Sequence, residues 1–244
     1  MNERPPRPRY SAADVRRRRA AAVLLLVLVV VGSAASWARG DDSQAATQAA
    51  GPRSTGPSSV SPATLGVAPE VVVVQRGQGA LDAVPGSVSA PGRGEVVAVR
   101  VDVERGIGVA VQAFADEVMD TLNDPRSWGG DGTRTFARTD GTADVRVILA
   151  SPLTAADLCR PLVTNGRLSC SSGERAILTS YRWANGTAEF PDLGVYRRYV
   201  VNHEVGHVLG QAHERCPAAG QPAPVMQQQT IRVAPCTPNA WPFP

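Results

Sequence analysis

Between residues 95 and 122, the order of apolar and polar side chains predicts a strand followed by a helix. The segment from Glu95 to Glu104 begins apolar and then alternates between apolar and polar residues, as in a strand with one wetter face. Gly106 and Gly108 end this strand. Apolar residues then recur at helical spacing at Val111, Phe114, Ala115, Val118 and Leu122. This spacing predicts an amphipathic helix that stops before Pro125.

Apolar content predicts further strands on both sides of this unit, over residues 70–75, 133–139, 143–150 and 175–183. The second and third of these ranges are separated by Asp140-Gly141, a turn signal that often joins two strands of a hairpin. A loop rich in Gly, Pro and Ser follows the first range.

The last predicted helix begins near Gly194 and runs to about Leu209, with Asp192 as its N-cap. The tail after it is rich in Pro, Gln and Ala and shows no periodicity. Strands and helices in this order predict an α+β or α/β domain over residues 69–244.

The N-terminal part of the chain predicts a membrane anchor. A basic tail over residues 1–19 ends in four arginines, and an apolar run over 20–38 follows it. As a helix, this run would span about 28 Å, close to the thickness of the hydrocarbon core of a bilayer. The basic flank should stay cytoplasmic, so a single-pass anchor would place the C-terminal domain outside the cell. The alternative is a signal peptide cleaved within the small residues 32–36, which would release a secreted protein.

Composition adds a flexible linker and argues against one class of partner. Residues 39–68 are almost all Gly, Ala, Ser, Thr, Pro and Gln, as in a flexible tether. All 25 basic residues of the 244-residue chain are Arg, and residues 69–244 hold 16 of them against 18 acidic residues. A slightly acidic domain has no electrostatic footprint for nucleic acid, so we expect no such partner. We also expect the protein to be a monomer.

Four cysteines in an exported domain favour two disulfides. Three pairings are possible. We expect Cys159 to pair with Cys170 and Cys216 with Cys236, because each pair closes a short local loop. Cysteine ligation of a metal is the alternative, but no C-x-x-C spacing supports it.

The strongest chemical signal is that all three histidines of the chain lie between residues 203 and 213. His203 and His207 are four residues apart, so both imidazoles lie on one face of the predicted helix. Gly210 permits a left-handed turn that ends the helix and can return His213 to the same point. Three neutral imidazoles suit one Zn²⁺ ion and leave its fourth position open. The sequence therefore predicts a single catalytic zinc ion.

Glu204 follows the first histidine and is the predicted catalytic residue. It would act as general base toward a zinc-bound water and then as proton donor to the leaving amine. These groups together indicate hydrolysis of an amide bond.

The spacing His203-Glu-x-x-His207-x-x-Gly210-x-x-His213 resembles the extended zinc signature of the metzincin metallopeptidases. The segment 223–226 resembles their methionine turn, with Met226 as the corresponding residue. The resemblance implies a mixed twisted sheet with a long backing helix, a zinc-binding active-site helix and an irregular C-terminal subdomain. Gln228 departs from the pattern, since astacins and serralysins place a tyrosine that helps at the metal in that position.

The wider chain resembles an uncharacterised family of exported actinobacterial proteins over about residues 95–244. The segments that carry this resemblance are 124–128, 150–152, 196–199 and 238–242, together with the four cysteines.

The leading hypothesis is a membrane-tethered zinc metalloendopeptidase that acts on protein or peptide substrates outside the cell. One alternative is a non-catalytic, zinc-stabilised binding module of the cell envelope, in which Glu214 or Asp192 closes the fourth position. Another is a zinc amidase or peptidase that acts on peptidoglycan peptides.

Overall fold

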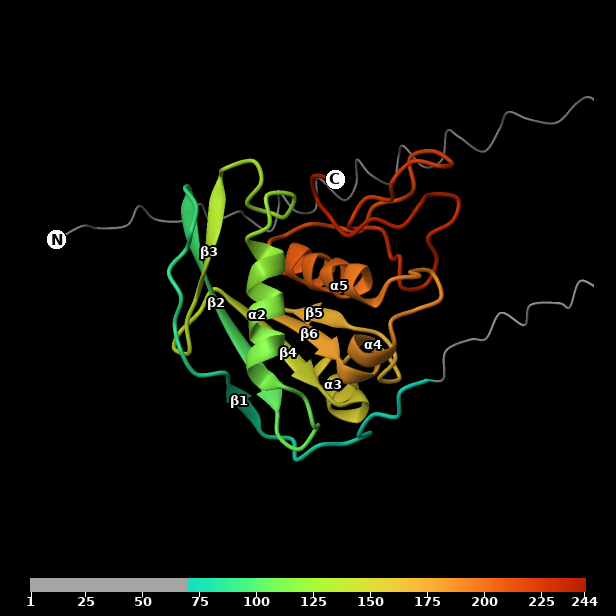
Figure 1. Ribbon diagram of the computed structural model, residues 1–244. Helices are drawn as coiled ribbons and strands as arrows, with labels where there is room; N and C mark the ends of the chain where they lie inside the picture. The colour runs from blue at the N-terminus through green and yellow to red at the C-terminus, as the bar shows by residue number, and fades with distance from the viewer. Residues whose placement is uncertain (1–69) are drawn as a thin grey trace, which may run out of the picture. The chain divides into compact units, whose positions relative to one another are not determined.

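The computed structural model describes residues 70–244 (Figure 1). Its elements, in chain order, are β1 (Leu81–Ala83), β2 (Glu95–Glu104), α2 (Val111–Leu122), β3 (Arg134–Arg138), β4 (Val145–Ala150), α3 (Pro152–Leu158), β5 (Cys170–Ser172), β6 (Arg175–Thr179), α4 (Ser180–Asn185) and α5 (Leu193–Val208). The expected tail, anchor and linker over 1–19, 20–38 and 39–68 lie outside the described residues. No helix in residues 70–244 is long and apolar enough to cross a membrane.

The strands form one six-stranded mixed sheet with the order β1-β2-β4-β6-β5, and β3 also pairs with β2. Strands β2, β4 and β6 run parallel, while β1 and β5 are antiparallel to their neighbours. Five of the six residues of β4 are buried, as expected for a central parallel strand covered on both faces. This mixed sheet with helices agrees with the expected α+β class at a coarse level.

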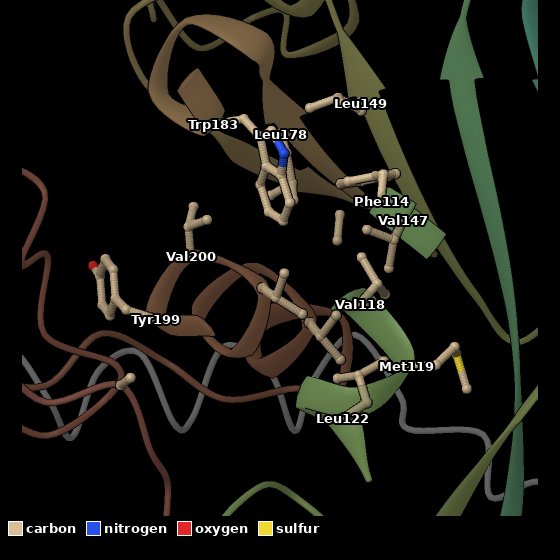
Figure 2. Packing of buried hydrophobic residues seen from close by; sticks show 14 of the residues in the cluster. Phe114, Val118, Met119, Leu122, Val147, Leu149, Leu178, Trp183, Tyr199 and Val200 are labelled. Carbon is tan, nitrogen blue, oxygen red and sulfur yellow. The ribbon is translucent and has the colours of Figure 1, made fainter. Parts of the chain in front are cut away.

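The main core lies between the sheet and helices α2 and α5. Alternate valines of β2, from Val97 to Val103, face this core. From α2, Phe114 packs edge-on against Trp183, with ring centroids 4.8 Å apart. Figure 2 shows Phe114 and Trp183 with Val200 of α5, which belongs to the same core. Full burial of each such side chain contributes about 1.5–3 kcal/mol, so the core fixes α5 against the sheet.

A smaller core lies on the opposite face of the sheet, where Ile148 and Ile177 pack with residues of α3 and with the Cys159–Cys170 disulfide. The second disulfide joins Cys216 and Cys236. Both pairings are those expected from the sequence.

The segment 70–75 was predicted to be a strand, and this prediction is wrong. Its backbone forms hydrogen bonds with a side chain and does not pair with a strand. Val71 N–H donates to Asn185 Oδ1 at 2.6 Å, and Asn185 Nδ2 donates to Val71 O at 3.0 Å. The valines of this run are largely exposed, and Val72 is 93% exposed. Apolar content alone therefore misled the prediction, because these valines add nothing to the core.

The Asp140-Gly141 turn does not join β3 and β4 in a hairpin. Both strands run parallel to β2, with β3 beside residues 95–99 and β4 beside residues 99–103. The Asp140 carboxylate instead accepts a hydrogen bond from Gly86 N–H at 3.0 Å, and Gly141 has no positive φ. A two-residue turn of type I′ needs positive φ at both central positions, so the hairpin geometry is absent.

The predicted strand over 175–183 ends at Thr179, and the short helix α4 follows it. The helical turn carries Trp183 onto Phe114 in the main core. The packing of Trp183 in the core therefore favours a helical turn, although the apolar run alone favoured a longer strand. The short elements β1, α3 and β5 gave no clear signal in the sequence.

Candidate metal centre

Helix α5 carries the first two histidines and the glutamate of the predicted site. Asp192 is its N-cap, as expected, and accepts a hydrogen bond from Val195 N–H at 2.8 Å. On the core side, Val201 and Val205 are fully buried. The helix ends near Leu209, and Gly210 follows with a φ of +90°, a conformation that side chains rarely adopt. The chain then turns back and brings His213 toward the helix.

The three imidazoles converge. His203, His207 and His213 each offer a ring nitrogen, and these atoms lie within 4.8 Å of one another. His207 Nε2 and His213 Nε2 are 3.0 Å apart. The ring centroids of His203 and His207, one helical turn apart, are separated by 4.8 Å. The structure therefore brings the three predicted ligands together.

Backbone carbonyls fix the orientation of two of these rings. His203 Nδ1 lies 2.8 Å from Val225 O, and His207 Nδ1 lies 2.9 Å from Gln211 O. A carbonyl can only accept, so each Nδ1 carries the proton and donates it. Each Nε2 is then left with a lone pair, the tautomer that a metal ligand requires.

Burial also favours the neutral form of the first histidine. It lowers the pKa of His203 to about 4, and the positive charges of the other two histidines act in the same direction. Burial likewise lowers the pKa of His213. Neutral imidazoles at neutral pH keep their lone pairs.

This donor set fits a divalent cation. His207 Nε2 and His213 Nε2 are 3.0 Å apart, so either a proton on His213 or a cation lies between the two nitrogens. Three imidazole nitrogens are typical ligands of Zn²⁺. Within residues 70–244, the cluster at ligand distance holds these three histidines and no carboxylate. Asp192 caps the far end of α5, and the side chain of Glu214 lies outside the cluster.

Glu204 lies beside this cluster and lines the same cavity. Its side chain is 5% exposed. Burial alone raises its pKa to about 8, because no hydrogen bond from residues 70–244 stabilises its charged form. The carboxyl group is therefore available to a group that enters the cavity.

A chain segment beneath the histidines includes Met226, which is fully buried. A Cβ atom added at Gly206 would lie 2.6 Å from Met226 Sδ and 2.6 Å from a ring atom of Trp128. Only glycine therefore allows Met226 and Trp128 to approach the helix between His203 and His207. The sequence pattern predicted Met226 beneath the site but did not predict this role for Gly206.

Tyr199, one turn before His203, anchors the same segment. Its hydroxyl donates to Gln227 O and accepts from Gln229 N–H, each at 2.9 Å. The side chains of Gln227 and Gln229 are buried and hydrogen-bonded to backbone carbonyls. Gln228, between them, is exposed and lines the histidine cavity. The three consecutive glutamines thus have different environments, which their sequence could not show.

The cavity has a volume of about 370 Å³. Its floor is α5, one wall is formed by the chain around Thr230, and the opposite wall runs from Leu162 to Ser171. This second wall includes part of the edge strand β5 and is closed by the Cys159–Cys170 disulfide. The sequence pattern did not predict this second wall. The feature of the sequence that could have indicated this wall was the expected Cys159–Cys170 disulfide, which constrains the loop over residues 162–169.

Comparison with known proteins adds a family assignment. The family described as "Protein of unknown function (DUF3152)" matches residues 67–240. No curated protein and no solved structure matches the chain.

Proposed function

We propose that this chain, which belongs to the DUF3152 family of proteins of unknown function, is a zinc-dependent peptidase that hydrolyses peptide bonds outside the cell. The observation that carries the proposal is the convergence of three imidazoles beside Glu204 in one cavity. The likeness of residues 203–213 to the metzincin signature supports the same reading.

In this proposal, His203, His207 and His213 hold the ion, and two backbone carbonyls keep the first two rings in the required tautomer. When bound, the ion supplies a Lewis acid and lowers the pKa of water. Glu204 would take a proton from the attacking water and pass it to the leaving amine, because the positive charge of the bound ion would favour the charged form that burial alone disfavours. No group in residues 70–244 forms a hydrogen bond with its carboxyl group, which leaves it free to move that proton.

The shape of the cavity favours a peptide substrate. Strand β5 is at the edge of the sheet and lines the cavity through Cys170 and Ser171. An extended peptide can add to such an edge through main-chain hydrogen bonds. The exposed side chains of Leu162, Val163 and Ile231 on the cavity rim would contact apolar residues of the substrate.

The proposed location follows from the N-terminal sequence and from the disulfides. Two disulfides are typical of proteins outside the cytosol. The proposed tether to the membrane is the apolar run over residues 20–38.

The experiment that tests this function is the substitution Glu204→Gln in the full chain. Peptide hydrolysis should fall by about 10²–10⁴-fold, the usual contribution of a general base, while zinc content stays at the wild-type value. Glu174→Gln is the matched control, because Glu174 is exposed on the turn between β5 and β6. Equal turnover by the Glu204→Gln variant and the wild type would refute the role of Glu204.

The same assay separates the two alternatives. Cleavage of peptidoglycan stem peptides but not of a protein-derived peptide library would favour the envelope substrate. Stoichiometric zinc without cleavage of either substrate would favour the non-catalytic binding module.

A further inference from the structure

A second cavity, of about 290 Å³, adjoins the histidine cavity. The two cavities share Gln228 and Ile231 in their walls. The second cavity lies between residues 214–216, which directly follow His213, and residues 227–234. The Cys216–Cys236 disulfide and a hydrogen bond from Glu214 N–H to Met226 O at 3.1 Å hold these two segments together. The second cavity is therefore next to the histidine cavity, on the side of Gln228 and Ile231.

The charges that line this second cavity are mainly positive. Arg215 and Arg232 both line it, and both are exposed. Neither guanidinium group takes part in an ion pair or side-chain hydrogen bond with another group in residues 70–244, unlike Arg105 or Arg146, each of which binds an aspartate. Glu214 is the one acidic residue among the lining residues. Two guanidinium groups against one carboxylate leave the cavity with a positive charge.

A buried acceptor lies in the same wall. Gln227 is 8% exposed and lines the cavity. Its Nε2 donates to Arg232 O at 3.0 Å and to Val233 O at 2.9 Å, but no group in the described residues donates to its Oε1. Buried polar atoms are rarely left without a partner. This oxygen is buried and can only accept, so the two guanidinium groups, and not Gln227, would bind a carboxylate in this cavity.

We propose that this second cavity is a carboxylate-binding subsite that selects peptides with an acidic group next to the bond in the histidine cavity. The inference rests on the proposed peptidase function. Guanidinium groups bind carboxylates through paired, charge-assisted hydrogen bonds, and they discriminate against the uncharged amide of the same shape. The carboxylate has two possible sources, an Asp or Glu side chain or the free C-terminus of the peptide.

Binding can be measured separately from hydrolysis in the full-length, zinc-loaded Glu204→Gln variant. The probes are two fluorescein-labelled pentapeptide libraries that differ only in a central Asp or Asn, each with a free or an amidated C-terminus. Fluorescence anisotropy should show at least tenfold tighter binding of the Asp library if the side chain is the source. Tighter binding of the free-acid peptides, whatever the central residue, would identify the C-terminus as the source.

The preference for the carboxylate should disappear in the Arg215→Ala/Arg232→Ala variant and persist in Arg93→Ala. Arg93 is the matched control, because it is exposed, has no ion pair within residues 70–244 and does not line the second cavity. Glu214→Gln should strengthen the preference by removing the opposing charge. Both arginines are on the surface, and a circular dichroism spectrum equal to that of the wild type would establish that the double variant is folded.

Equal binding of the acidic and the neutral libraries would overturn the proposal. A preference that survives loss of both arginines would also overturn it, and so would the absence of binding by any library. If the preference depends on the arginines but the wild type cleaves no peptide, the subsite stands and the proposed peptidase function fails.

Discussion

Gly206 lies inside helix α5, where replacement by alanine normally stabilises a protein. Alanine is favoured over glycine in a helix interior by about 1 kcal/mol. In this helix, however, the added methyl group would lie 2.6 Å from Met226 Sδ and 2.6 Å from a ring atom of Trp128, closer than Cβ atoms approach other groups. Met226 is fully buried, and Trp128 Nε1 donates to Asn202 O at 2.9 Å, so neither neighbour can move freely.

The expected effect of Gly206→Ala is therefore a net loss of stability. Overpacking of a core costs about 1–3 kcal/mol, and contact with two held neighbours places this site at the upper end of that range. After the gain in helix propensity, the free energy of unfolding should fall by about 1–2 kcal/mol. Zinc affinity should fall as well, because Val225, which precedes Met226, accepts the hydrogen bond from His203.

Urea unfolding of the metal-free protein measures the first effect, with Gly194→Ala as the matched control. Gly194 is in the first turn of the same helix, and a Cβ atom there would lie 3.2 Å from Asp192 Oδ1, the acceptor of the N-cap, whose exposed side chain can shift by a few tenths of an ångström. That variant should unfold within about 0.5 kcal/mol of the wild type, as is usual for surface substitutions. A Gly206→Ala variant that is more stable than the wild type would show that the methionine and the tryptophan do not require glycine.

The remaining predictions concern stability. Burial raises the pKa of Glu104, but hydrogen bonds from Ser151, Gly79 and Thr154 outweigh this effect and hold the pKa below its usual value of 4.5. The stability that charged Glu104 contributes is therefore complete above pH 4.5 and is lost as the pH falls below it. Glu104→Gln should therefore cost about 2 kcal/mol at pH 7 and flatten the decline in urea stability toward pH 3; an unchanged slope would contradict the reasoning. Asp192→Ala should cost about 1 kcal/mol through loss of the N-cap of α5, and an unchanged thermal midpoint would contradict that role. Removal of the Cys159–Cys170 disulfide by double alanine substitution should cost about 3 kcal/mol, because it closes a short loop in the unfolded chain; a loss under about 1 kcal/mol in urea would contradict this estimate.

The elements that the sequence predicted well are those in which local pattern and tertiary role agree. Strand β2 alternates because one face meets α2 and the other carries polar residues, and α2 and α5 have recognisable ends. The prediction that the second face is wetter is wrong, because Asp102 and Glu104 are buried. Arg146 binds the first of these carboxylates and Ser151 N–H binds the second. The three histidines could be placed together because helical spacing and one glycine turn determine their relative positions. The disulfides followed from local loop closure.

The failures have physical causes that a single sequence does not display. The valines of 70–75 have strand propensity, but no strand pairs with them and Asn185 binds their backbone. The Asp140-Gly141 turn lies between two strands that each pair with β2. Close approach of Met226 and Trp128 to Gly206, and the wall near Leu162, depend on contacts between segments far apart in the chain.

Zinc content after equilibrium dialysis tests the central claim most directly, because the proposed chemistry depends on a metal held by the three histidines. The full chain, dialysed against zinc and analysed by mass spectrometry, should retain about one ion per chain at neutral pH. His207→Ala should lose it, while Glu204→Gln should keep it. Wild-type protein without zinc above background, or a His207→Ala variant with unchanged zinc content, would contradict the account.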